Sequence, residues 1–124
     1  MKNHAPRFLA LVEAARARII EADAATLQSR LEQPGPPHVV DVREDHEWAA
    51  GRIAGAVHLS KGVIERDIER VFPDLDAELV LVCGGGFRSA LAADALQDMG
   101  YRRVASLAGG WRAWKALGGA IDGG

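Results

Sequence analysis

The sequence has little of what internal cross-links or membrane insertion would require. Only one of its 124 residues is a cysteine, Cys83, so no disulfide can form within the chain, and this usage fits a reducing compartment. No apolar run approaches the length of a membrane span. Because Glu13, Arg16 and Arg18 interrupt the N-terminal apolar stretch, we expect no signal peptide and a cytoplasmic protein.

Excess charge and metal-ligand patterns are also missing. The formal net charge of −2 favours neither nucleic acid nor a membrane surface as a partner. The histidines His4, His38, His46 and His58 do not have the spacing of zinc ligands, either with one another or with Cys83. We therefore expect no metal and no bound cofactor. The length and the apolar content of 48% are those of one globular domain.

What is present centres on the stretch from Val80 to Leu91. An apolar run ends at Cys83, three glycines and Arg88 follow, and then an alanine-rich helical pattern begins. Glycines lack a Cβ, so successive N–H groups can turn inward, and the first N–H groups of a helix are unpaired. With the charge of Arg88 they predict a small anion-binding cup that favours the thiolate form of the cysteine. The alternative is an inert buried thiol, which needs no electropositive surroundings.

A second pair of charged residues lies at the carboxyl end of the apolar run His38–Val42. Asp41 and Arg43 stand where this strand would end, and sites in open α/β sheets gather at the carboxyl ends of strands. A solvated turn with an incidental ion pair explains the two residues equally well. Arg43 is also a candidate partner for Glu47.

Strand and helix patterns alternate along the chain and predict an α/β domain with a parallel sheet and right-handed crossovers. The first helical pattern, in residues 7–18, precedes this alternation. We therefore divide the chain into a helical extension, 1–18, and a single domain, 19–124. The apolar stripe of the extension predicts a helix that covers the core, with contact to a partner as the alternative. The expected helices cover 7–18, 24–32 (capped by Asp23), 44–50, 62–71 (capped by Ser60), 89–99 and 110–117, and the expected strands 19–21, 38–42, 56–59, 78–82 and 104–107.

The loop from Cys83 to Ser89 resembles the active-site loop of the rhodanese-like sulfurtransferases, in which a cysteine carries a persulfide. The resemblance extends over about residues 39 to 119, in the order that the family shows. The further matching stretches are Asp41-Val42-Arg43-Glu44, Glu47-Trp48, Gly51-Arg52-Ile53-Ala54-Gly55-Ala56, Gly100-Tyr101, Val104 and Leu107-Ala108-Gly109-Gly110-Trp111-Arg112-Ala113-Trp114.

The resemblance implies a three-layer α/β domain, with a five-stranded parallel sheet in the order 1-5-4-2-3 and helices on both faces. It implies that Cys83 takes a sulfane sulfur from a donor such as thiosulfate and passes it to cyanide, a thiol or a protein acceptor. Asp41 and Arg43 would support the loop. The residues that would bind the substrate and stabilise the persulfide are Gly84, Gly85, Gly86, Phe87, Arg88 and Ser89.

Two other functions remain open. A rhodanese-like module can bind a partner or sense redox state without catalysis, and phosphatases of the cell-cycle type share the scaffold. Those phosphatases have five residues between the cysteine and the arginine, whereas four separate Cys83 from Arg88. The sequence departs from the family at Arg52 and Ala54, where histidine and proline are common. Its loop is all glycine before Phe87, which leaves the preferred donor open. Trp111 is expected to pack in the core, with a place beside the pocket as the alternative.

Overall fold

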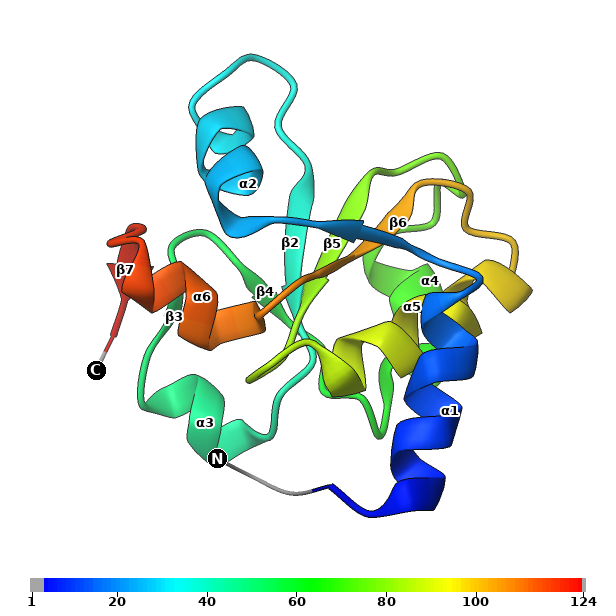
Figure 1. Ribbon diagram of the computed structural model, residues 1–124. Helices are drawn as coiled ribbons and strands as arrows, with labels where there is room; N and C mark the ends of the chain where they lie inside the picture. Colours follow the sequence, from blue (N-terminus) through cyan, green and yellow to red (C-terminus); the bar gives the residue numbers. More distant parts are fainter. Residues whose placement is uncertain (1–3, 124) are drawn as a thin grey trace.

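A five-stranded parallel sheet forms the centre of the computed structural model, which describes residues 4–123. The strands lie in the order β1–β6–β5–β2–β4, which is the expected order 1-5-4-2-3 when the five are numbered along the chain. Their bounds are β1 Ile20–Ala22, β2 His38–Asp41, β4 Val57–His58, β5 Leu79–Val82 and β6 Val104–Leu107. Figure 1 shows the helices packed around this sheet; they are α1 Pro6–Arg16, α2 Ala24–Leu31, α3 Asp45–Ala49, α4 Ile64–Val71, α5 Phe87–Asp98 and α6 Gly110–Ala116.

The sheet has a hydrophobic core on each face because neighbouring side chains of a strand point to opposite sides. In β5, Leu79 and Leu81 pack with α4 and α5, whereas Val80 and Val82 pack with α2 and α6. All four side chains are buried, which explains why this strand is apolar without alternation. The expected α/β architecture, a parallel sheet in this strand order with helices on both faces, is confirmed.

Helix α1 packs against α5, and Figure 1 shows the two helices side by side. Val12 and Ala15 of α1 are buried in this contact. Just after the helix, the Arg18 guanidinium donates to both carboxylate oxygens of Asp94, at 2.9 and 2.6 Å. The extension thus covers α5, as its apolar stripe predicts.

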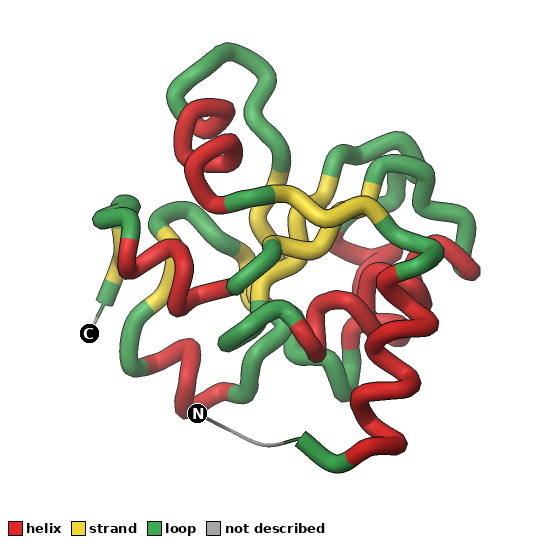
Figure 2. The backbone as a smooth tube through the Cα atoms, in the orientation of Figure 1, coloured by secondary structure: helices red, strands yellow, loops and turns green. Residues whose placement is uncertain are grey.

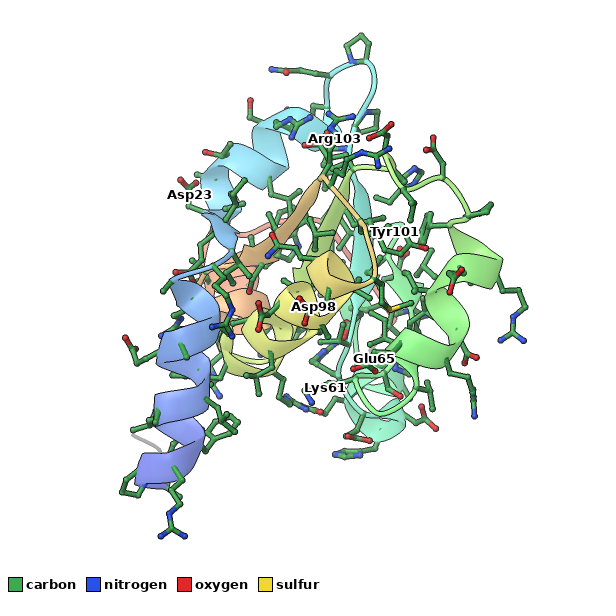
Figure 3. The ribbon with its side chains drawn as sticks, turned by 90° about the vertical axis from the view of Figure 1, so that its right-hand side faces the viewer. Asp23, Lys61, Glu65, Asp98, Tyr101 and Arg103 are labelled. Atoms are coloured by element: carbon green, nitrogen blue, oxygen red, sulfur yellow. The ribbon has the colours of Figure 1, made fainter. Side chains whose placement is uncertain are left out.

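Most element bounds agree with the sequence, including the Asp23 cap, whose carboxylate accepts the Thr26 N–H at 2.8 Å; Figure 3 shows Asp23 at the start of α2. The cap expected at Ser60 is wrong. Helix α4 begins later, after Val63, and has no side-chain cap, while the Ser60 carbonyl accepts the Val63 N–H in a turn.

One small sheet was not expected. Strands β3 (Arg52–Ile53) and β7 (Ile121–Asp122) pair antiparallel, so the glycine-rich tail turns back onto the domain. The Trp114 indole N–H donates to the Ala120 carbonyl at 2.9 Å, and this hydrogen bond holds the tail against the domain. Strands of two residues carry no readable periodicity, and this pairing joins segments far apart in the chain.

Candidate active site

Cys83 lies at the carboxyl end of β5, and the loop after it leads directly into α5; Figure 2 shows this connection as the loop between strand and helix. Helix α5 begins at Phe87, two residues before the expected start, with Gly86 as its N-cap. Gly86 has φ +97°, and a Cβ there would come within 3.3 Å of the Gly109 nitrogen and the Leu107 oxygen. Only glycine fits this turn without strain.

The thiol is surrounded by hydrogen-bonding groups. The Gly86 N–H donates to the Cys83 Sγ at 3.1 Å, and the Ser89 hydroxyl lies 3.4 Å from the same sulfur. Ser89 in turn lies 2.8 Å from the hydroxyl of Ser106 on β6. Both serines and the cysteine are buried. Within the expected set of residues 84–89, the structure therefore brings Gly86 and Ser89 to the sulfur, and it adds Ser106, which sequence reasoning missed.

Arg88 forms an ion pair with Glu47 of α3 rather than remaining free. Its two Nη atoms lie 2.8 and 3.1 Å from the two carboxylate oxygens. This hydrogen-bonded pair lowers the pKa of Glu47 to about 2 and raises the pKa of Arg88. Because Glu47 is committed to Arg88, the expected Arg43–Glu47 pair is wrong. The positive charge of Arg88 is largely balanced within the protein.

Asp41 and Arg43 form a buried ion pair at the carboxyl end of β2. The Asp41 carboxylate accepts the Arg43 backbone N–H at 3.0 Å and its Nη2 at 2.8 Å, and Nη2 also donates to the Gly51 carbonyl at 2.7 Å. The Arg43 guanidinium lies 4.8 Å from the centre of the Trp111 ring, and the backbone N–H of Trp111 donates to the Cys83 carbonyl at 2.8 Å. That Asp41 and Arg43 support the loop stays a prediction. Trp111 would transmit this support, because it contacts both Arg43 and the Cys83 carbonyl.

A pocket of about 350 Å³ opens beside the thiol. It contains the expected residues Cys83, Gly84, Gly85, Phe87 and Arg88, together with five that sequence reasoning did not place there. These five are His4, Phe8, His46, Glu47 and Arg112.

Arg112 lies over the glycine loop. Its backbone N–H donates to the Gly84 carbonyl at 3.2 Å, and a Cβ on Gly85 would lie 2.9 Å from its Nη1. The absence of side chains at Gly84 and Gly85 therefore leaves the space that this guanidinium occupies. The expected strand order could have predicted the position of Arg112. Strands β5 and β6 are neighbours in that order, so the start of α6, which follows β6, must lie beside the loop that follows β5.

Residues 4–123 contain no group of three or more histidine, cysteine, aspartate or glutamate side chains that could hold a metal ion. Within the same range, no helix combines the length and the apolar character needed to cross a membrane.

Comparison with known sequences finds the rhodanese-like domain model over residues 23–117, a range that begins after α1. YtwF of Bacillus subtilis, named as a candidate sulfurtransferase, is 36% identical over 97 residues, which cover 78% of this chain and 91% of that protein. GlpE of Pseudomonas putida, named as a thiosulfate sulfurtransferase, is 40% identical over 78 residues, or 63% of this chain and 69% of that protein.

Solved structures give the same fold. A rhodanese-like domain from Anabaena aligns with a TM-score of 0.75 at 30% identity, over 83% of this chain and 78% of its own. A Rhodopseudomonas palustris protein of unknown function aligns with a TM-score of 0.85 at 31% identity, over 98% of this chain and 99% of its own. That protein is described as a candidate tyrosine phosphatase, and the alignment is long enough to include α1.

Proposed function

This chain belongs to the rhodanese-like domain family, and from that premise we propose that it is a sulfurtransferase that carries a sulfane sulfur as a persulfide on Cys83. Its relatives with sulfurtransferase names support the reaction class. The observation that carries the proposal is the pair of polar groups at the thiol: the Gly86 N–H donates to Sγ at 3.1 Å, and the Ser89 hydroxyl lies 3.4 Å from Sγ, where it can donate to a thiolate. Groups placed in this way stabilise a sulfur anion in a buried site.

The reaction has two covalent steps. The Cys83 thiolate attacks the outer sulfur of thiosulfate, a new S–S bond forms, and sulfite leaves with the electron pair of the broken S–S bond. A thiolate or cyanide then attacks the outer sulfur of the persulfide, and Cys83 leaves as the thiolate. No oxidant, metal or further cofactor enters this balance. The scheme predicts ping-pong kinetics, and a protein thiol would be an acceptor of the same chemical class.

The loop residues have separate tasks in this scheme. Gly86 and Ser89 stabilise the negative sulfur, while the absence of side chains at Gly84 and Gly85 gives the Arg112 guanidinium its place beside the pocket. Phe87 lines the pocket. Arg88, whose charge is shared with Glu47, holds α3 against the start of α5 and adds a positive potential at the thiol.

Phosphatase activity is the second candidate, because of the description of the Rhodopseudomonas palustris structure. Two features argue against it here. Four residues between Cys83 and Arg88 make a smaller loop than the phosphatases of this scaffold have. Among residues 4–123, Glu47 is the only carboxylate that lines the pocket, and its pairing with Arg88 leaves no carboxylic acid to protonate a leaving group.

The test is the intact mass of the purified protein after incubation with thiosulfate, beside Cys83→Ser. We expect the wild type alone to gain one sulfur atom and to lose it again when cyanide is added. A thiol-based persulfide is the second donor, so that a poor fit of thiosulfate does not hide the activity. Absence of the gain with both donors would contradict the proposal and favour a binding module, and release of phosphate from para-nitrophenyl phosphate would favour the phosphatase.

A further inference from the structure

The pocket has two unlike walls beside the thiol. On one side Arg112 of α6 extends over Gly85, and on the other His4 and Phe8 approach Phe87. The His4 and Phe87 ring centres are 4.5 Å apart, and those of His4 and Phe8 are 5.2 Å apart. We call the three rings the aromatic wall. Two of them come from the N-terminal extension, which lies outside the matched family region.

Arg112 is the cation available to a ligand. Arg88 also lines the pocket, but both of its Nη atoms are bonded to Glu47. Within residues 4–123, Arg112 takes part in no ion pair with a carboxylate. Its side chain is exposed at the pocket, so an anion can reach it without displacing an internal partner.

The aromatic wall supplies the opposite chemistry. Phe8 and Phe87 are partly exposed, with ring centres 6.3 Å apart, and the Arg16 guanidinium lies 4.8 Å from the Phe87 ring centre. Partly exposed rings around a pocket offer apolar area to a ligand. The volume of about 350 Å³ lies in the range of sites for small organic ligands, roughly 300–1,000 Å³, and exceeds what a small inorganic anion fills.

We propose that this pocket selects anionic sulfur donors with an apolar, preferably aromatic, body, with Arg112 binding the anionic group and the aromatic wall packing against the body. The proposal rests on the sulfurtransferase function and assigns its donor class. For an organic thiosulfonate, R–SO₂–S⁻, the Cys83 thiolate forms the S–S bond to the terminal sulfur. The bond from that sulfur to the sulfonyl sulfur breaks, and the sulfinate R–SO₂⁻ leaves with the electron pair.

The first test compares methanethiosulfonate with benzenethiosulfonate, two monoanions that differ in the apolar body. We measure sulfinate release under steady-state turnover with cyanide. The wild type should show a lower KM for the aryl donor, by about 3- to 10-fold, as expected for added aromatic contacts. Phe8→Ala and, separately, His4→Ala should raise the KM for the aryl donor more than the KM for the methyl donor, so that this preference falls. Leu11→Ala is the matched control, because Leu11 lies on the exposed side of the same extension, with 62% of its surface exposed.

The second test concerns the cationic wall. Arg112→Gln should raise the KM for both donors by about tenfold, with little change in kcat, because one charge-assisted contact to the anionic group is lost. Lys115→Gln, on the same helix and outside the pocket, is the control and should leave both KM values unchanged.

The outcomes separate the pocket from the reaction. If both donors load Cys83 with equal KM, or if Phe8→Ala and Arg112→Gln behave like their controls, the donor class is wrong and the sulfurtransferase function stands. If the wild type gains no sulfur from these donors, from thiosulfate or from a thiol-based persulfide, the function itself fails and the donor class falls with it.

Discussion

At the amino edge of the sheet Glu78 pairs with Arg30 and Arg103, and at the carboxyl edge Asp41 pairs with Arg43. Figure 3 shows Arg103 at the first edge, remote from Lys61 and Glu65, which follow β4 at the other. The side chains of Arg30 and Arg103 are 38% and 56% exposed, whereas those of Asp41 and Arg43 are 1% and 3% exposed.

Both edges therefore pair a carboxylate with arginine, but the pairs differ in their exposure to water. Water can replace either partner at the amino edge, so its ion pairs contribute little to stability. At the carboxyl edge water is excluded, and each charge depends on its partner. The thiol and its serine neighbours lie at this second edge, where buried polar contacts fix the geometry of the loop. Four substitutions test this contrast, taken from the largest expected effect to the smallest.

Asp41→Ala should have the largest effect on stability. It leaves the Arg43 guanidinium buried without its carboxylate, and such losses cost about 3–5 kcal/mol. The free energy of unfolding, from urea denaturation, measures the effect. A loss below about 1 kcal/mol would show that the carboxyl-edge pair behaves like a surface pair, and the contrast between the edges would fail.

Glu47→Gln should have an intermediate effect that depends on pH. The pKa of Glu47 falls from 4.5 to about 2 in the folded protein, which corresponds to about 3 kcal/mol, reduced to about 1–2 kcal/mol by partial exposure to solvent. Because the folded pKa is the lower one, this stabilisation is present above about pH 4.5 and is lost as the pH falls toward 2. Wild type and variant should therefore differ at pH 7 and converge near pH 2 in denaturation experiments. A difference that is independent of pH would contradict the assignment.

Ser106→Ala should cost about 1 kcal/mol, because the buried Ser89 hydroxyl loses one partner but keeps its contact with the Cys83 sulfur. The rate of sulfur loading on Cys83 should fall several-fold, since Ser89 is then free to rotate. Ser60→Ala, in the turn before α4, is the control: it makes the same substitution at a site away from the thiol and should leave the loading rate unchanged. An unchanged loading rate in Ser106→Ala would show that Ser106 does not orient the Ser89 hydroxyl for sulfur transfer.

Glu78→Gln should have the smallest effect, below about 1 kcal/mol, although Glu78 pairs with two arginines. The hydrogen bond from Arg30 lowers the pKa of Glu78, so what little it contributes is present at neutral pH and disappears as the carboxylate is protonated in acid. Urea denaturation at pH 7 and in high salt checks this expectation. A loss as large as that of Asp41→Ala would abolish the distinction between the edges.

Much of the fold could be predicted from the sequence because its signals are local. The apolar run before Cys83, the cap at Asp23 and the glycines that follow α3 and α5, Gly51 and Gly100, lie within a few residues of the structure they specify. The short strands β3 and β7 could not be predicted in this way, because their pairing joins Ile53 to Ile121 across the domain. Helix α5 begins at Phe87, two residues before the expected start at Ser89, because Gly86 in the left-handed conformation is its N-cap.

The sequence alone determined that a cysteine follows a central strand, that three glycines leave its loop open, and that a helix N-terminus lies behind it. Only the tertiary structure decided which charges reach that loop. In the sequence, Arg88 and Arg112 are equally plausible as free cations. In the structure, Arg88 is hydrogen-bonded to Glu47 of α3, whereas Arg112 extends into the pocket from α6. This difference between the two arginines depends on which distant elements of the chain contact each other at one edge of the sheet. The spacing of residues within a short stretch of sequence does not determine such contacts.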